Sequence, residues 1–98
     1  MTRIETHPGE ILREEFMIPL GLSANALARA LGVPPNRITT IIAAENPRAV
    51  TPDTALRLSR YFGTTPRLWL NLQLAYDLTK TMLQQGPRIE AAVQPRAA

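Results

Sequence analysis

The chain has 98 residues, of which 45% are hydrophobic, and it carries a formal net charge of +3 and no cysteine. That length suits a single domain with a small core. The apolar share argues against disorder, and the lack of cysteine excludes disulfides and thiolate metal sites. No apolar run approaches the ~20 residues that a membrane helix needs, and the first residues lack the apolar stretch of a signal peptide. We therefore expect a cytoplasmic protein with no membrane partner.

Proline-led starts and glycine stops mark most of the boundaries of five expected helices, because proline fits the first helical position and glycine the position just past the end. The first start is His7-Pro8-Gly9-Glu10, with His7 as the cap, and Thr51-Pro52 and Thr65-Pro66 repeat the pattern. The expected helices are residues 8–18, 24–31, 35–44, 52–62 and 66–85. Gly86-Pro87 are expected to end the last and longest helix.

Apolar side chains recur at helical spacing in these segments, and no segment shows the alternation typical of a strand. The sequence therefore predicts an all-α fold. The residues expected to face its core are Ile11, Leu12, Phe16, Leu20, Leu27, Ala28, Leu31, Ile38, Ile41, Ile42, Leu56, Leu58 and Phe62.

Residues 24–43 have the spacing of a helix-turn-helix. Ala28 places a small residue where two helices cross, and Gly32, four residues later, permits the positive φ of a sharp turn. Ile38 and Ile41 then hold the second helix against the first. In such motifs the second helix enters the major groove of duplex DNA. A purely structural helical hairpin is the alternative for this spacing.

The charge distribution agrees with a DNA-binding interpretation. Six of the eleven cations lie in residues 23–70 beside only two acids, and ten of the eleven are arginine. The planar guanidinium of arginine suits both phosphate and guanine recognition. Because charge alone favours an ordinary solvated surface, the DNA-binding prediction depends on the motif.

The candidate DNA-reading side chains face away from Ile38 and Ile41 on the 35–44 helix. They are Asn36, Arg37, Thr39, Thr40 and Ala43. Asn36 and Arg37 suit base edges or phosphate, the threonines offer a hydroxyl and a methyl group, and Ala43 offers only apolar contact. Arg48, in the loop after this helix, is a candidate phosphate contact. Each of these residues, considered alone, fits an ordinary solvated helix surface as well as it fits a DNA contact.

The 66–85 helix is apolar nearly all round, which indicates burial on more than one side. One stripe contains Leu68, Trp69, Leu72, Ala75 and Tyr76, and the other contains Leu70, Leu74, Leu78 and Met82. We expect one stripe to cover the core and the other to form a homodimer interface. The candidate interface residues are Leu70, Leu74 and Leu78, or the opposing face around Trp69 and Leu72. A central helix buried within a monomer is the alternative.

The sequence contains no convincing set of catalytic residues. His7 is the only histidine and lies at an expected helix cap, and Glu14 and Glu15 point about 100° apart on a helix. There is no glycine-rich phosphate loop and no metal-ligand spacing. We therefore expect no catalytic residue, no metal, no cofactor and no small-molecule substrate.

Several segments also resemble a known family. The stretch from Ser23 to Val33, SANALARALGV, is similar to the motif of XRE (lambda-repressor-like) DNA-binding domains. More narrowly, four blocks resemble HigA antitoxins: HPGEIL from His7, TALRL from Thr54, YFGT from Tyr61 and LWLNLQ from Leu68.

This resemblance covers about residues 7–78 and implies both a fold and a function. The implied fold is a five-helix lambda-repressor-like domain that dimerises. The implied protein is a repressor that binds a palindromic operator of its own toxin–antitoxin operon. It also neutralises a HigB-type, RelE-like ribonuclease toxin. We expect an N-terminal extension over 1–6, the domain over 7–86 and a short tail over 87–98.

Two positions depart from the family pattern. The family often has glutamine at the start of the second helix for a phosphate contact, whereas this chain has Ala24, which leaves Asn25 nearest. A base-reading position near the start of the third helix is here Pro35. Two other functions therefore remain open: a phage-type or metabolic repressor without a toxin partner, and a protein-interaction module that has lost DNA binding.

Overall fold

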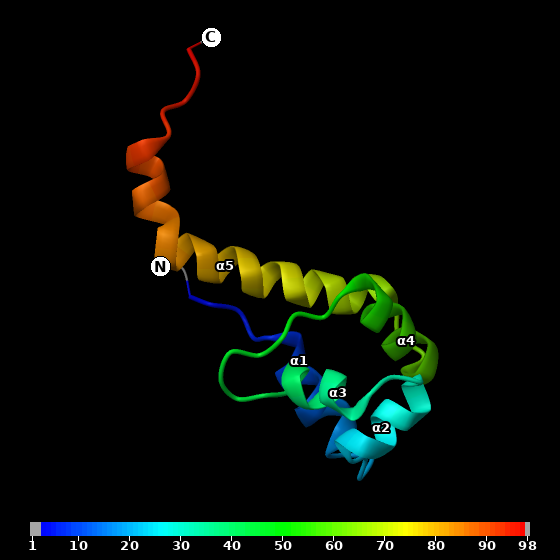
Figure 1. Cartoon of the computed structure of the whole chain (residues 1–98). Coiled ribbons are helices and arrows are strands. Elements are labelled where there is room, and N and C mark those ends of the chain that lie inside the picture. Colours follow the sequence, from blue (N-terminus) through cyan, green and yellow to red (C-terminus); the bar gives the residue numbers. More distant parts are fainter. Residues whose placement is uncertain (1–2, 98) are drawn as a thin grey trace.

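The computed structural model describes residues 3–97, which are helical with no strand (Figure 1). In chain order the elements are α1 (Pro8–Ile11), the π-helical segment η1 (Leu12–Met17), α2 (Ala24–Leu31), α3 (Pro35–Ile41), α4 (Pro52–Phe62) and α5 (Pro66–Ala92). The all-α prediction is confirmed. Residues 1–2 of the expected extension and residue 98 of the expected tail lie outside the described residues.

The helices α2 and α4 begin and end where the sequence predicts. Each has a hydroxyl cap, since Ser23 accepts a hydrogen bond from the Ala26 amide and Thr51 accepts one from the Thr54 amide. Each is followed by a glycine in the left-handed region, Gly32 with φ 71° and Gly63 with φ 74°. A cap at one end and such a glycine at the other fix both boundaries.

The expected 8–18 helix is formed by two segments with different hydrogen bonding. After the single α-helical turn of α1, the chain widens into η1, and the Ile18 amide then bonds to the Arg13 carbonyl at 2.9 Å, five residues back. Leu12 and Met17 of this segment are buried. The wider turn still delivers its apolar side chains to the core.

The third helix is shorter than predicted, because α3 ends at Ile41 and not at residue 44. Ile42 leaves the helical region with φ −89° and ψ 4°, and Asn46 in the following loop has a positive φ of 48°. The Arg48 amide bonds to the Thr40 carbonyl at 2.9 Å and returns the loop to the helix. That bond satisfies a terminal carbonyl that a longer helix would have used internally.

The predicted end of the fifth helix at residue 85 is wrong. The helix α5 continues to Ala92 with Pro87 inside it, so residues 87–92 of the expected tail are helical. Proline removes one backbone bond and crowds the carbonyl four residues earlier, so a helix bends there if it continues. Figure 1 shows α5 changing direction in its orange part.

The core takes buried side chains from η1, α2, α3, α4 and α5, and its largest member is Trp69, which is fully buried. Phe16 packs on Trp69 with ring centroids 5.3 Å apart, and the indole Nε1 donates to the Thr64 hydroxyl at 2.8 Å. The other side chains with no exposure include Leu12, Leu27, Ile38 and Leu58. Three expected core residues are not in it: Leu56 is 60% exposed, Leu20 is 62% exposed and Ile11 is half-buried outside the core.

The second half of α5 extends beyond the other helices and gives the molecule dimensions of 53 × 26 × 22 Å (Figure 1). Within the described residues, no helix combines the length and the apolar character needed to cross a membrane.

Candidate nucleic-acid interface

The helix-turn-helix has the geometry that its spacing predicts. Gly32 caps α2 with φ 71° and ψ 36°, and its amide bonds toward the carbonyls of Ala28 and Arg29. Ala28 is fully buried at the crossing of α2 and α3. Ile38 and Ile41 are buried beneath α3, so the opposite face of that helix is left for other contacts.

That opposite face is polar, and its residues differ in solvent exposure and in the hydrogen bonds that they already make. Asn36 and Thr39 are exposed, whereas Arg37 and Thr40 are half-buried. The Thr40 hydroxyl donates to the Asn36 carbonyl at 2.6 Å, and the corresponding Thr39 contact is 3.4 Å long. The Thr40 hydroxyl therefore donates its hydrogen bond within the helix. Thr39 is the better placed of the two to contact another molecule.

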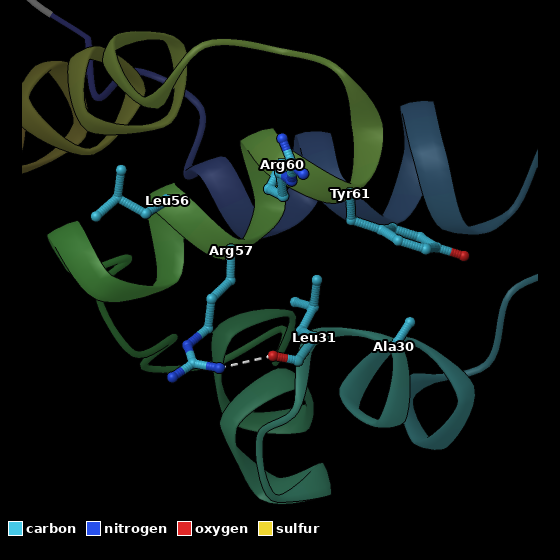
Figure 2. A pocket seen from close by; sticks show the side chains of 6 residues that line it. All are labelled: Ala30, Leu31, Leu56, Arg57, Arg60 and Tyr61. Atoms are coloured by element: carbon cyan, nitrogen blue, oxygen red, sulfur yellow. Dashed lines mark hydrogen bonds between the residues drawn. The ribbon is translucent and has the colours of Figure 1, made fainter.

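Arg37 is held by an acidic residue of α4. Its Nη1 donates to Asp53 Oδ2, which also accepts from Arg57 Nε at 3.0 Å. Arg57 Nη1 in turn donates to the Leu31 carbonyl at 2.7 Å, and Figure 2 shows this side chain crossing from α4 to the end of α2. The hydrogen bonds of Arg57 and Arg37 lower the pKa of Asp53, because both stabilise its charged form.

Two residues of this network were not among the predicted site residues. They are Asp53, which accepts from both arginines, and Arg57, which also reaches the end of α2. Both lie more than fifteen residues from their partners on α3 or α2. A local sequence pattern carries no information about such a distant pairing.

The loop after α3 places a second cation near Arg37. Arg48 is exposed, and together with Arg37 it lines a small cleft of about 130 Å³ between this loop and the start of α4. The structure therefore brings these two predicted site residues to one side of the molecule. The backbone bond from Arg48 to Thr40 fixes the loop there.

Asn25 lies on the other side of α3, at the start of α2, and is exposed. It lines a hollow between the starts of α2 and α3 together with Arg29, Val33 and Pro35. Arg29 was not predicted as a site residue, although it follows Asn25 by four positions and so shares its helix face. The hollow thus carries one amide and one guanidinium.

The predicted dimer residues of α5 fall into two groups according to their solvent exposure. Trp69 is fully buried within this chain, so its prediction as a dimer contact is wrong, because a second chain cannot reach it. Leu70 and Leu72 are half-buried against the core. Leu74 and Leu78, by contrast, are 62% and 54% exposed.

Gln73 shares the buried face of α5 with Trp69. Its Oε1 accepts from the Val50 amide at 2.8 Å, and its Nε2 donates to Asp77 at 3.0 Å. Gln73 therefore fixes the chain just before α4 to the long helix. A glutamine within an apolar stripe could have indicated this contact, because a buried amide requires partners.

Comparison with known proteins adds family relationships to this geometry. Residues 12–69 match the helix-turn-helix family model HTH_3. Virulence-associated protein I of Dichelobacter nodosus is 61% identical over 72 residues, which are 74% of this chain and 65% of that protein's own length. The aligned stretch therefore spans a little less than two thirds of that relative.

Two similar solved structures are of antitoxins together with promoter or operator DNA. The Pseudomonas aeruginosa antitoxin HigA with the higBA promoter is 41% identical with a TM-score of 0.86, and the match covers 94% of this chain and 98% of that one. The antitoxin GraA in complex with its operator is 47% identical with a TM-score of 0.90, covering 100% and 97%.

Proposed function

Because this chain belongs to the helix-turn-helix family HTH_3 of XRE-type regulators, we propose that it is a sequence-specific repressor of duplex DNA. We further propose that it is the antitoxin of a type II toxin–antitoxin module that represses its own operon. The repressor acts in the cytoplasm, where the operator lies.

One observation carries the DNA-binding part of this proposal. Two relatives that are at least 41% identical over nearly the whole chain are solved together with promoter or operator DNA. In helix-turn-helix proteins the second helix of the motif lies in the major groove, with its first residues at the base edges. In this chain that helix is α3, and Asn36 and Thr39 lie exposed on it.

The polar side chains around α3 then take two roles. Asn36, Arg37 and Thr39 contact base edges, because an amide, a guanidinium and a hydroxyl all match groups in the major groove. Asn25, Arg29 and Arg48, which flank α3 on either side, contact phosphates and fix the register of the protein on the duplex.

A binding titration over a series of salt concentrations tests this assignment on the DNA upstream of the gene. Replacing Asn36 or Arg37 by alanine should cost about 1–3 kcal/mol and relax preference at one operator position. Replacing Arg48 should weaken all sequences alike and reduce the salt slope by about one unit. Arg88→Ala, on the exposed far part of α5, is the matched control and should change neither quantity.

The assignment is wrong if the combined Asn36→Ala, Arg37→Ala and Thr39→Ala variant binds the operator as the parent does. Adding Thr40→Ala should change little further, because its hydroxyl is already bonded to the Asn36 carbonyl. A repressor of this kind also works as a homodimer. Two copies of α3 should therefore read an inverted repeat whose half-site centres lie ~34 Å, or a multiple of it, apart.

The toxin partner is proposed to be a HigB-like ribonuclease, and the acidic N-terminal region is proposed as its docking surface. Glu5, Glu10, Glu14 and Glu15 are all exposed there. A basic ribonuclease would be attracted to this surface, which speeds encounter at low salt. The alternative is a repressor without a toxin.

Co-expression tests whether this chain is an antitoxin or a repressor without a toxin. The partner to use is the product of a small RelE-like reading frame beside the gene. Co-purification and loss of ribonuclease activity are expected for an antitoxin. Glu14→Lys combined with Glu15→Lys should slow association in low salt while operator affinity stays nearly intact. Unchanged association would place the toxin on another surface, and no association would favour the repressor without a toxin.

A further inference from the structure

We propose that the segment His7-Pro8-Gly9, which lies outside the helix-turn-helix, is a positioning element for DNA binding. It sets where α3 ends and how the Arg48 loop lies. This inference rests on the proposed function, since it names residues that act on DNA only through α3 and Arg48. The segment itself is buried, so any effect that it has on DNA must pass through the residues packed against it.

Gly9 lies against the last residue of α3, Ile41. A β-carbon built on Gly9 would lie 1.9 Å from the Ile41 carbonyl oxygen and 2.7 Å from the carbonyl carbon. Both atoms are backbone, so neither can move without displacing the end of α3. The first turn of α1 therefore lies directly against the helix that we propose reads the DNA.

The requirement for glycine here does not come from its own backbone. Gly9 is in a helix and does not have a positive φ. Alanine is a better helix former than glycine by about 0.5–1 kcal/mol, so a substitution by alanine would favour α1 itself. Any penalty must come from the contact with Ile41.

His7 holds this segment in place from two sides. Its Nδ1 accepts from the Gly9 amide at 2.9 Å, which caps α1. Its ring packs edge-on against Tyr76 of α5, with centroids 4.7 Å apart and planes at 84°. The segment is thus fixed to the long helix on one side while Gly9 contacts α3 on the other.

The same histidine faces the loop that follows α3. His7 and Tyr76 line a hollow of about 380 Å³ together with Ile42, Ala43 and Pro47 of that loop. The same loop contains Arg48, whose amide is bonded to the Thr40 carbonyl. A shift of the segment therefore displaces α3 and Arg48 together, and both belong to the proposed DNA-binding surface.

The test compares Gly9→Ala with Gly86→Ala, which adds the same methyl group to a helical glycine with open space around it. Operator and random duplex DNA are titrated over a salt series at a temperature where circular dichroism shows each variant to be folded. Gly9→Ala should lose about tenfold or more in operator affinity, comparable to one good base contact. Random DNA should lose less, so the specificity ratio should fall, and Gly86→Ala should match the parent.

A second variant keeps the test decisive if Gly9→Ala does not fold. His7→Asn retains a side-chain oxygen for the cap but removes the ring that packs on Tyr76. It should lower the specificity ratio and reduce the salt slope as Arg48 leaves its phosphate. A purely structural role would lower thermal stability but leave both quantities unchanged in the folded protein, and that result would overturn the inference. If the parent chain itself fails to bind the operator, the proposed function is wrong instead.

Discussion

Arg37 of α3 donates a hydrogen bond to the carboxylate of Asp53, the second residue of α4. An acid so near a proposed DNA surface would repel phosphates if it stood alone. Here it is neutralised by Arg37 and Arg57 and orients the Arg37 guanidinium. If Arg37 reads a base as proposed, Asp53 lowers the non-specific attraction to DNA and in return fixes the direction of the Arg37 side chain.

Asp53→Asn should therefore make binding stronger but less selective. The change removes one negative charge and frees Arg37 to bind phosphate, so affinity for random DNA should rise and the salt slope should increase by about one unit. The ratio of operator to random affinity should fall. Glu90→Gln removes an exposed acid from the far part of α5 and is the matched control. An unchanged ratio in Asp53→Asn would show that the acid does not orient Arg37.

Gly32 should tolerate asparagine much better than valine. Its φ of 71° lies in the left-handed region, which costs an ordinary L-residue roughly 1–2 kcal/mol and a β-branched residue more. Asparagine is one of the few residues that adopts this conformation readily. Thermal melts should place Gly32→Val well below Gly32→Asn. Equal melting temperatures would mean that the turn between α2 and α3 can adopt another shape.

Mild acid should destabilise the protein through His7, its only histidine. Burial is the largest cause that lowers the pKa of His7, and the nearby Lys80 adds to it, while Asp77 and the Arg48 backbone act in the opposite direction. The unfolded chain, with an ordinary histidine pKa of about 6.5, then binds more protons than the folded one. The stabilisation is complete above that value and is lost as the pH falls from it toward the lower pKa of the folded state.

Denaturant unfolding measured between pH 7.5 and 5 should show this loss in the parent chain. His7→Asn should show a much smaller change over the same range, because it has no group that titrates there. A parallel decline in both proteins would assign the pH dependence to other groups.

The dimer should be held by the exposed side of α5. Light scattering at micromolar concentration should give twice the chain mass of 10.8 kDa. Leu74→Glu combined with Leu78→Glu should give the monomer, because each change places a charge on the apolar face. Leu56→Glu makes a similar change at an exposed leucine of α4 and should leave the dimer intact. A dimer that survives the α5 changes would have to use another surface.

The parts of the fold that could be predicted are those whose signals are local. The bounds of α2 and α4 follow from a capping hydroxyl and a glycine within a few residues of each helix end. The end of α3 could not be predicted in this way, because the Arg48 bond to Thr40 replaces a helical bond from beyond the helix. The continuation of α5 through Pro87 was missed since proline usually ends a helix, and here the helix bends instead.

The candidate site shows the same division. Asn36 and Thr39 were predicted on the exposed face of α3 and lie there, because helical periodicity determines which face is free. The pairing of Arg37 with Asp53 depends on how α4 packs, which no local pattern records. Which side of α5 faces the core stayed open for a related reason, and the structure buries the side that carries Trp69. Two apolar stripes on one helix do not reveal which of them the rest of the chain covers.

The extended part of α5 also affects how the protein moves in solution. The radius of gyration of the whole structure is 16.2 Å, which exceeds the roughly 13 Å of a compact chain of about 100 residues. Such a chain diffuses more slowly than a sphere of equal mass and leaves a gel-filtration column early. A single copy would therefore elute like a larger globular protein, so an elution volume calibrated with compact standards would overstate its mass.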